Sequence, residues 1–120
     1  MIQQLEISGI HMEVGDDLRK YAVKKIGSLD HFVPRAARQS MHAHVQLKEL
    51  KQKGAKECVC EVTITLPQET LNVTEGTVNI FAAVDIAETK LRAQLRKYKE
   101  LHDNPRLHRR LLVRFRRKPA

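Results

Sequence analysis

The sequence predicts an α+β domain in the order β-α-β-β-β-α, with two helices packed on one face of a four-stranded sheet. Three consecutive segments between residues 41 and 74 alternate apolar and polar side chains, which is the period of half-buried strands. Residues 3–8 alternate in the same way, and residues 15–31 and 79–101 repeat apolar residues at helical spacing. Because one sheet face is apolar and both helices are amphipathic, both helices should cover that face.

The first two elements are a short strand, residues 3–8, and a helix that begins at Gly15. Two aspartates follow Gly15 directly, and carboxylates suit the positive end of a helix dipole. Apolar residues then recur to about His31, and Pro34 restricts any continuation. The residues of this apolar stripe are Leu18, Tyr21, Ala22, Ile26 and Leu29.

The next three strands form an antiparallel meander, with a polar turn at residues 51–56 and a second turn at 67–69. The alternation turns the following residues inward: Met41, Ala43, Val45, Leu47, Cys58, Cys60, Val62, Ile64, Leu66, Leu71 and Val73. It turns the following toward water: His42, His44, Gln46, Glu61, Thr63, Thr65, Asn72 and Thr74. One apolar face and one polar face therefore define this sheet.

The last helix, residues 79–101, has a narrow apolar seam with basic residues along both edges, and Asn79 suits its N-cap. The seam consists of Val84, Ala87, Leu91, Leu95 and Tyr98. Lys90 and Lys97 flank one edge, and Arg92, Arg96 and Lys99 flank the other. Such edges suit phosphate binding, but surface helices are often rich in Lys and Arg and bind nothing. The helix alone leaves both interpretations open.

The formal net charge of +8 suggests an anionic partner, either nucleic acid or a membrane surface, and its distribution is uneven. Residues 1–101 hold 15 Lys/Arg and 13 Asp/Glu, whereas residues 102–120 hold seven Lys/Arg and one acid. We therefore expect one αβ domain over residues 1–101 and a basic, flexible tail over residues 102–120. The tail residues expected to contact phosphates are Arg106, Arg109, Arg110, Arg114, Arg116, Arg117 and Lys118.

The two cysteines, Cys58 and Cys60, share one face of a strand, which disfavours a disulfide between them and indicates a reduced, cytoplasmic chain. The first residues have neither the basic start nor the apolar run of a signal peptide. No stretch approaches the ~20 apolar residues of a membrane span. The sequence therefore predicts a soluble protein that does not bind membranes.

His42 and His44 share a strand face, which raises two alternatives, a metal site and a ribonuclease. A structural metal site usually needs four convergent ligands, whereas the strand pattern turns the cysteines inward and the histidines outward. A ribonuclease would use the histidines with Glu61, but no phosphate-binding loop or nucleophile motif accompanies them. We therefore predict no metal, no cofactor and no catalytic residue.

Two runs of residues, one in each helical half of the chain, form a recognisable pattern. The first run is Phe81-Ala82-Ala83-Val84-Asp85-Ile86, then Lys90-Leu91 and Gln94-Leu95-Arg96-Lys97-Tyr98-Lys99. The second is Ile7-Ser8-Gly9, His11, Glu13-Val14, Leu18-Arg19, Tyr21, Lys25-Ile26, Leu29 and His31-Phe32. Together they resemble the ribosome hibernation promoting factor family, also called ribosome-associated inhibitors or sigma-54 modulation proteins. Family members usually have Arg where Ala93 stands and are often acidic at Arg92, so charge on that edge is shifted by one position.

The resemblance implies a fold like the double-stranded-RNA-binding domain and binding to 16S-type rRNA in the decoding region of the small ribosomal subunit. There the protein would block tRNA and mRNA binding and inhibit translation in stress or stationary phase. The length corresponds to the short form of the family, expected to be a monomer when free, with no small-molecule substrate.

The predicted RNA-binding residues lie on both helices and in one loop. They are Lys90, Arg92, Arg96, Lys97 and Lys99 on the last helix, Arg19, Lys20, Lys24 and Lys25 on the first helix, and His11 in the loop before it. A loop-stabilising role for His11 explains that residue equally well. The alternative functions are a protein-binding transcription regulator, as the sigma-54 modulation name suggests, and another structured-RNA-binding module.

Overall fold

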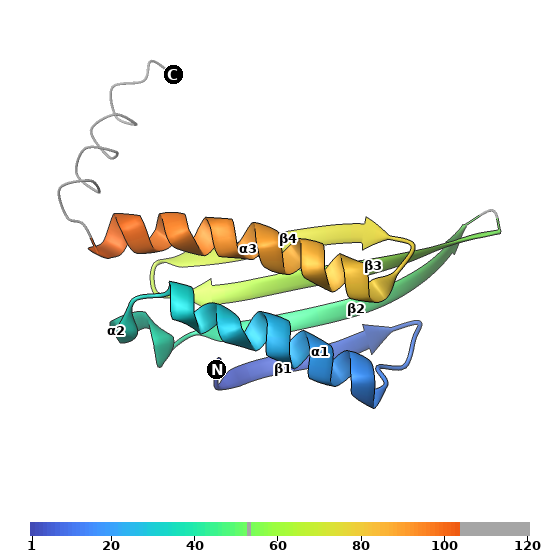
Figure 1. Cartoon of the computed structure of the whole chain (residues 1–120), viewed down its shortest axis with the longest axis horizontal. Coiled ribbons are helices and arrows are strands. Elements are labelled where there is room, and N and C mark those ends of the chain that lie inside the picture. Colours follow the sequence, from blue (N-terminus) through green and yellow to red (C-terminus); the bar gives the residue numbers. More distant parts are fainter. Residues whose placement is uncertain (53, 104–120) are drawn as a thin grey trace, which may run out of the picture.

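The computed structural model of the chain describes residues 1–52 and 54–103 and has the predicted order of elements (Figure 1). The elements are β1 (Gln4–Ile10), α1 (Asp16–Gly27), the 3-10 helix η1 (Ser28–Phe32), α2 (Arg35–Arg38), β2 (His42–Gln52), β3 (Ala55–Leu66), β4 (Glu69–Thr77) and α3 (Ile80–Asp103). The β-α-β-β-β-α prediction is confirmed. The short segments η1 and α2 were not predicted.

The sheet has the strand order β1-β2-β3-β4, with α1 and α3 on one face (Figure 1). β1 runs parallel to β2, with Gln4 opposite His42, and the other two pairings are antiparallel. Parallel neighbours require a crossover connection, which α1 supplies across the face of the sheet. We refer to α1 and α3 together as the helix layer.

The core lies between the helix layer and the sheet. All five seam residues predicted on α3 are buried, and the most exposed of them, Tyr98, has only 3% of its surface exposed. The Tyr98 hydroxyl donates a hydrogen bond to the Pro67 carbonyl at 3.0 Å, and burial raises its pKa. The Asn79 side chain accepts a hydrogen bond from the Phe81 amide at 2.9 Å, which confirms the predicted N-cap.

The opposite sheet face is polar, as predicted, and its side chains pair with one another. Ser8 and His44 are 3.1 Å apart, and Thr63 donates to Asn72 at 2.9 Å. Glu61 forms an ion pair with Lys48 rather than with a histidine. The histidines are exposed while the cysteines are buried, and among the described residues no three potential metal ligands converge.

The first helix ends earlier than predicted, at Gly27 rather than near His31. The Gly27 carbonyl also accepts a tertiary hydrogen bond from the Ile2 amide at 2.9 Å. The chain then tightens into η1. The last predicted turn of this helix is therefore a 3-10 turn.

The β2–β3 hairpin is longer than predicted, because the strands pair out to Gln52 and Ala55 where we predicted a turn over residues 51–56. Gly54 takes φ 79°, which lets the chain reverse within a tight turn. At the same end of the sheet β4 continues to Thr77, which pairs with Cys58, so this strand also extends beyond the predicted alternation.

Both cysteines are buried and free, as predicted, and burial raises the pKa of Cys60 from 9.0 to about 12. The raised pKa keeps the Cys60 thiol protonated near pH 8, so an aromatic disulfide reagent should modify it slowly in the native protein and promptly in denaturant. Because folding raises this pKa, the thiol's contribution to stability is complete below pH 9 and is lost as the pH rises toward 12. Prompt reaction of both thiols in the native protein would contradict this expectation. The variant Cys58→Ala leaves Cys60 as the single thiol, so its rate of modification can be measured by itself.

No helix in the described part of the chain is long and apolar enough to cross a membrane.

Candidate nucleic-acid interface

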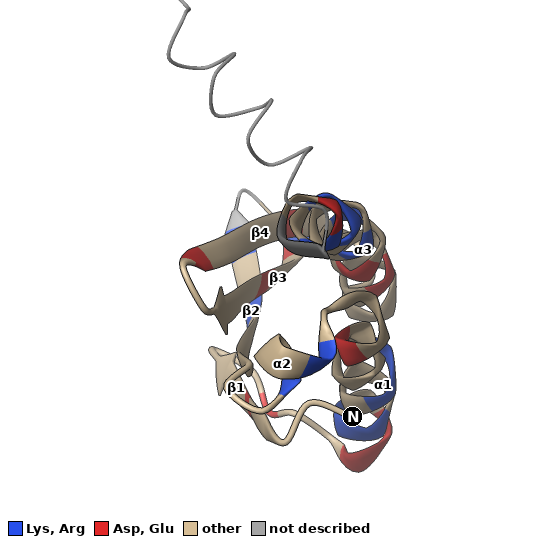
Figure 2. Ribbon diagram, turned by 90° about the vertical axis from the view of Figure 1, so that its left-hand side faces the viewer, with Lys and Arg blue, Asp and Glu red and all other residues tan. Residues whose placement is uncertain are grey.

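The predicted basic residues lie on the helix layer, on one side of the sheet (Figure 2). Seven of the nine helical cations are exposed, and Lys25 and Arg92 are half-buried. The nine are Arg19, Lys20, Lys24 and Lys25 on α1 and Lys90, Arg92, Arg96, Lys97 and Lys99 on α3. The fold therefore joins two basic segments that are far apart in the sequence.

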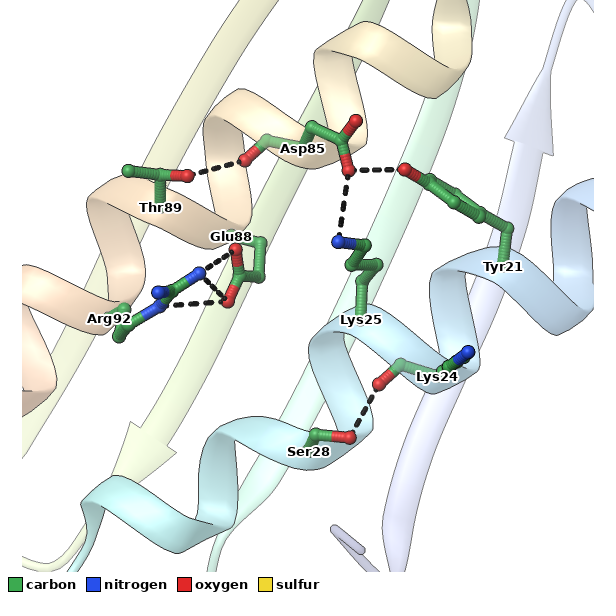
Figure 3. A network of polar contacts seen from close by, with 8 residues as sticks. All are labelled: Tyr21, Lys24, Lys25, Ser28, Asp85, Glu88, Thr89 and Arg92. Atoms are coloured by element: carbon green, nitrogen blue, oxygen red, sulfur yellow. Dashed lines mark hydrogen bonds and ion pairs between the residues drawn. The ribbon is translucent and has the colours of Figure 1, made fainter.

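Asp85 of α3 links the two helices (Figure 3). Its carboxylate accepts a close hydrogen bond from the Tyr21 hydroxyl and lies 3.6 Å from the Lys25 ammonium nitrogen. The Tyr21 ring also meets the Phe81 ring edge to face, with 5.3 Å between centroids. The hydrogen bond to Asp85 is the main cause of a raised Tyr21 pKa. These contacts set the position of α1 against α3.

Three of the nine cations are neutralised by carboxylates. Besides Lys25, Lys90 forms a close ion pair with Glu75 of β4. Both carboxylate oxygens of Glu88 lie 2.7 Å from a terminal guanidinium nitrogen of Arg92, and the Arg92 Nε donates to one of them at 3.0 Å (Figure 3). These hydrogen bonds raise the Arg92 pKa. Neutralised cations are weaker ligands for a phosphate than free ones, because the phosphate must compete with the existing partner.

The six other helical cations have no ion pair with any carboxylate whose side chain the structure describes. These uncompensated cations are Arg19, Lys20 and Lys24 on α1 and Arg96, Lys97 and Lys99 on α3. All six are exposed. The structure thus divides the nine helical cations into six side chains that present free positive charge and three that are paired with a carboxylate.

His11 lies in the loop between β1 and α1, where it is exposed and has φ 59°. It lines a surface depression together with Glu49, Leu50 and Lys51, near the end of β2. None of these neighbours belongs to the predicted RNA-binding set. A positive φ is uncommon for a residue with a side chain. The contact of His11 with RNA and its loop-stabilising role both stay predictions.

Two residues of this surface were missed by sequence reasoning, Glu88 and Phe32. Glu88 is buried, with 7% of its surface exposed, and its spacing of four residues from Arg92 was a visible signal for an ion pair. Phe32 lies beneath the guanidinium groups of Arg92 and Arg96, whose central carbons are 5.9 and 5.4 Å from its ring centroid. No spacing rule predicts that contact, because it joins η1 to α3.

The predicted tail contacts lie outside the described residues. α3 itself continues to Asp103, two residues beyond the predicted end of the domain.

Comparisons with known proteins agree with the fold. The sequence model of the family described as Sigma 54 modulation protein / S30EA ribosomal protein matches residues 5–102. A protein of Staphylococcus aureus (strain COL) named ribosome hibernation promotion factor is 35% identical over 99 residues. The match covers 80% of this chain and 48% of that protein, so the chain spans about half the length of this curated relative.

Two solved structures resemble the chain over most of its length. The Protein Y N-terminal domain of Thermus thermophilus has 26% sequence identity and a TM-score of 0.64, covering 81% of this chain and 97% of that domain. A ribosomal subunit interface protein from Coxiella burnetii has 22% sequence identity and a TM-score of 0.65, covering 81% of this chain and 98% of that protein chain. At this low identity, the likeness supports the fold alone. Since the family match extends from β1 into the end of α3, the chain belongs to the Sigma 54 modulation protein / S30EA ribosomal protein family.

Proposed function

We propose that this chain is a ribosome hibernation factor, which binds the small ribosomal subunit and inhibits translation by occupancy. Its family is non-enzymatic, which confirms the prediction that it is not an enzyme. The name of the Staphylococcus aureus relative supports the proposal. The observation that carries it is the helix layer, on which six uncompensated cations share one side of the sheet.

The partner of this surface is 16S-type rRNA in the decoding region, where the bound protein takes the place of tRNA and mRNA. Structured RNA is recognised through its shape, its phosphates and its 2′-hydroxyls, by donors on rigid elements. The contacts of Asp85 with Tyr21 and Lys25 make α1 and α3 such a rigid pair. The seven Lys/Arg of residues 102–120 add phosphate contacts. The free protein is a cytoplasmic monomer, made in stress or stationary phase.

Sedimentation with purified small ribosomal subunits tests this function. Binding should saturate near one protein per subunit, translation should stop at the same ratio, and the rRNA should remain intact. Purified large subunits serve as the control and should bind less protein at the same salt concentration.

Three results would contradict the proposal. No binding to small subunits excludes it. Binding that survives complete digestion of the rRNA favours a protein-binding regulator. Cleavage of RNA at substoichiometric protein favours the ribonuclease alternative.

A further inference from the structure

We infer that Phe32 is a positioning residue for RNA binding, whose ring holds the Arg96 guanidinium so that its edge donates two hydrogen bonds to one RNA phosphate. The inference rests on the proposed function, because it concerns how the same surface binds the phosphates of its RNA partner. It adds a residue without charge to a surface otherwise defined by its cations.

The Phe32 ring forms the floor under two arginines of α3. The central guanidinium carbons of Arg96 and Arg92 are 5.4 and 5.9 Å from the ring centroid, within the range of a cation–π contact. These arginines are four residues apart and therefore share one side of the helix. Phe32 itself is half-buried and packs against the core, so the fold holds the position of its ring.

The two arginines above the ring have different roles. The carboxylate of Glu88, 10% exposed, binds the Arg92 guanidinium through both oxygens and balances its charge. Arg96 has the same ring beneath it but no ion pair with a described carboxylate. Arg96 is thus the free cation of the pair, and Arg92, bound by Glu88, lies over the same ring.

The contact with Phe32 leaves the donors of Arg96 available. A phenylalanine ring offers no acceptor except the face of its π system, so the planar N–H groups of Arg96 remain free to match two oxygens of a phosphate. An arginine held over a ring meets RNA with less freedom left to lose, which lowers the entropy cost of binding. Lys97 and Lys99, with no cation–π contact to a described aromatic ring, offer flexible point charges instead.

The test compares variants of the full chain for affinity toward purified small ribosomal subunits over a series of salt concentrations. Arg96→Lys retains the charge but loses the planar fork, and Phe32→Leu retains all charges but loses the ring. We expect each to weaken binding about tenfold, the value of one charge-assisted hydrogen bond. Phe32→Tyr should bind like the wild type. Arg35→Lys is the matched control and should also have no effect, because Arg35 lies on α2, outside the predicted RNA-binding set.

The double variant distinguishes positioning from a general effect on the fold. If Phe32 acts through Arg96, Phe32→Leu should cost no further affinity once Arg96 is Lys. Equal losses in both backgrounds would overturn the inference, as would wild-type affinity in Arg96→Lys. Arg96 is exposed, so its substitution leaves folding intact even if Phe32→Leu lowers the melting temperature. Failure of the wild-type chain to bind small subunits would instead refute the proposed function.

Discussion

Reversing the charge of Arg96, Lys97 and Lys99 together should weaken binding to the small ribosomal subunit on the order of 10²-fold or more at 0.1 M salt. Each phosphate contact contributes ~0.7–0.9 to the slope of log affinity against log salt, and three such contacts multiply. The slope should therefore fall by about 2–3. All three side chains are exposed and unpaired with any described carboxylate, so the triple Glu variant should fold.

Lys90 and Arg92 are left unchanged, because a glutamate at either place would face Glu75 or Glu88 and destabilise the fold. The matched control reverses three cations elsewhere, Arg35 on α2, Lys51 on β2 and Lys53, which follows β2 in the sequence. It alters the net charge equally and should bind more than tenfold tighter than the helix variant. Equal losses in the two variants would show that total charge, rather than the helix layer, determines affinity.

Leu91→Ala should lower the free energy of unfolding by about 2–5 kcal/mol, because it removes buried methyl groups and leaves a cavity under α3. Leu91 is fully buried, and α3 packs on β3 and β4. For a domain of this size each 1 kcal/mol lowers the melting temperature by roughly 4–8 °C, so the midpoint should fall by about 10 °C or more.

Urea unfolding and thermal melts measure this effect. Ile86→Ala is the matched control, since it truncates a side chain of the same helix that is 40% exposed and should cost no more than about 1 kcal/mol. A loss at Leu91 no larger than at Ile86 would mean that the seam of α3 does not support the fold.

The sheet faces and the seam of α3 were predictable because burial imposes a period that the sequence shows directly. Asn79 was predictable as well, because an N-cap depends on residues close in the sequence. The end of α1 was not, since the apolar spacing runs on to Leu29 in η1 and does not distinguish an α-helical turn from a 3-10 turn. The long β2–β3 hairpin was missed because its polar residues look like a turn, although they pair across two strands.

The basic surface was predictable as a set of residues but not as a distribution of charge. The sequence shows which residues are cations and on which edge of a helix they lie. Whether a carboxylate neutralises them depends on tertiary partners such as Glu75, which approaches Lys90 from β4. The Phe32–Arg96 contact has the same origin, because η1 and α3 meet only in the folded chain. Only the pair of Glu88 and Arg92 could have been identified from its spacing.

The placement of α1 and α3 on the same side of the sheet also affects how the protein approaches a polyanion. The six uncompensated cations lie on the helix layer, whereas the opposite sheet face carries histidine, threonine and asparagine side chains and the balanced pair of Lys48 and Glu61. Under the proposed function, this asymmetry should turn the helix layer toward the polyanion before contact and raise the association rate at low ionic strength. The effect should disappear as salt screens the field.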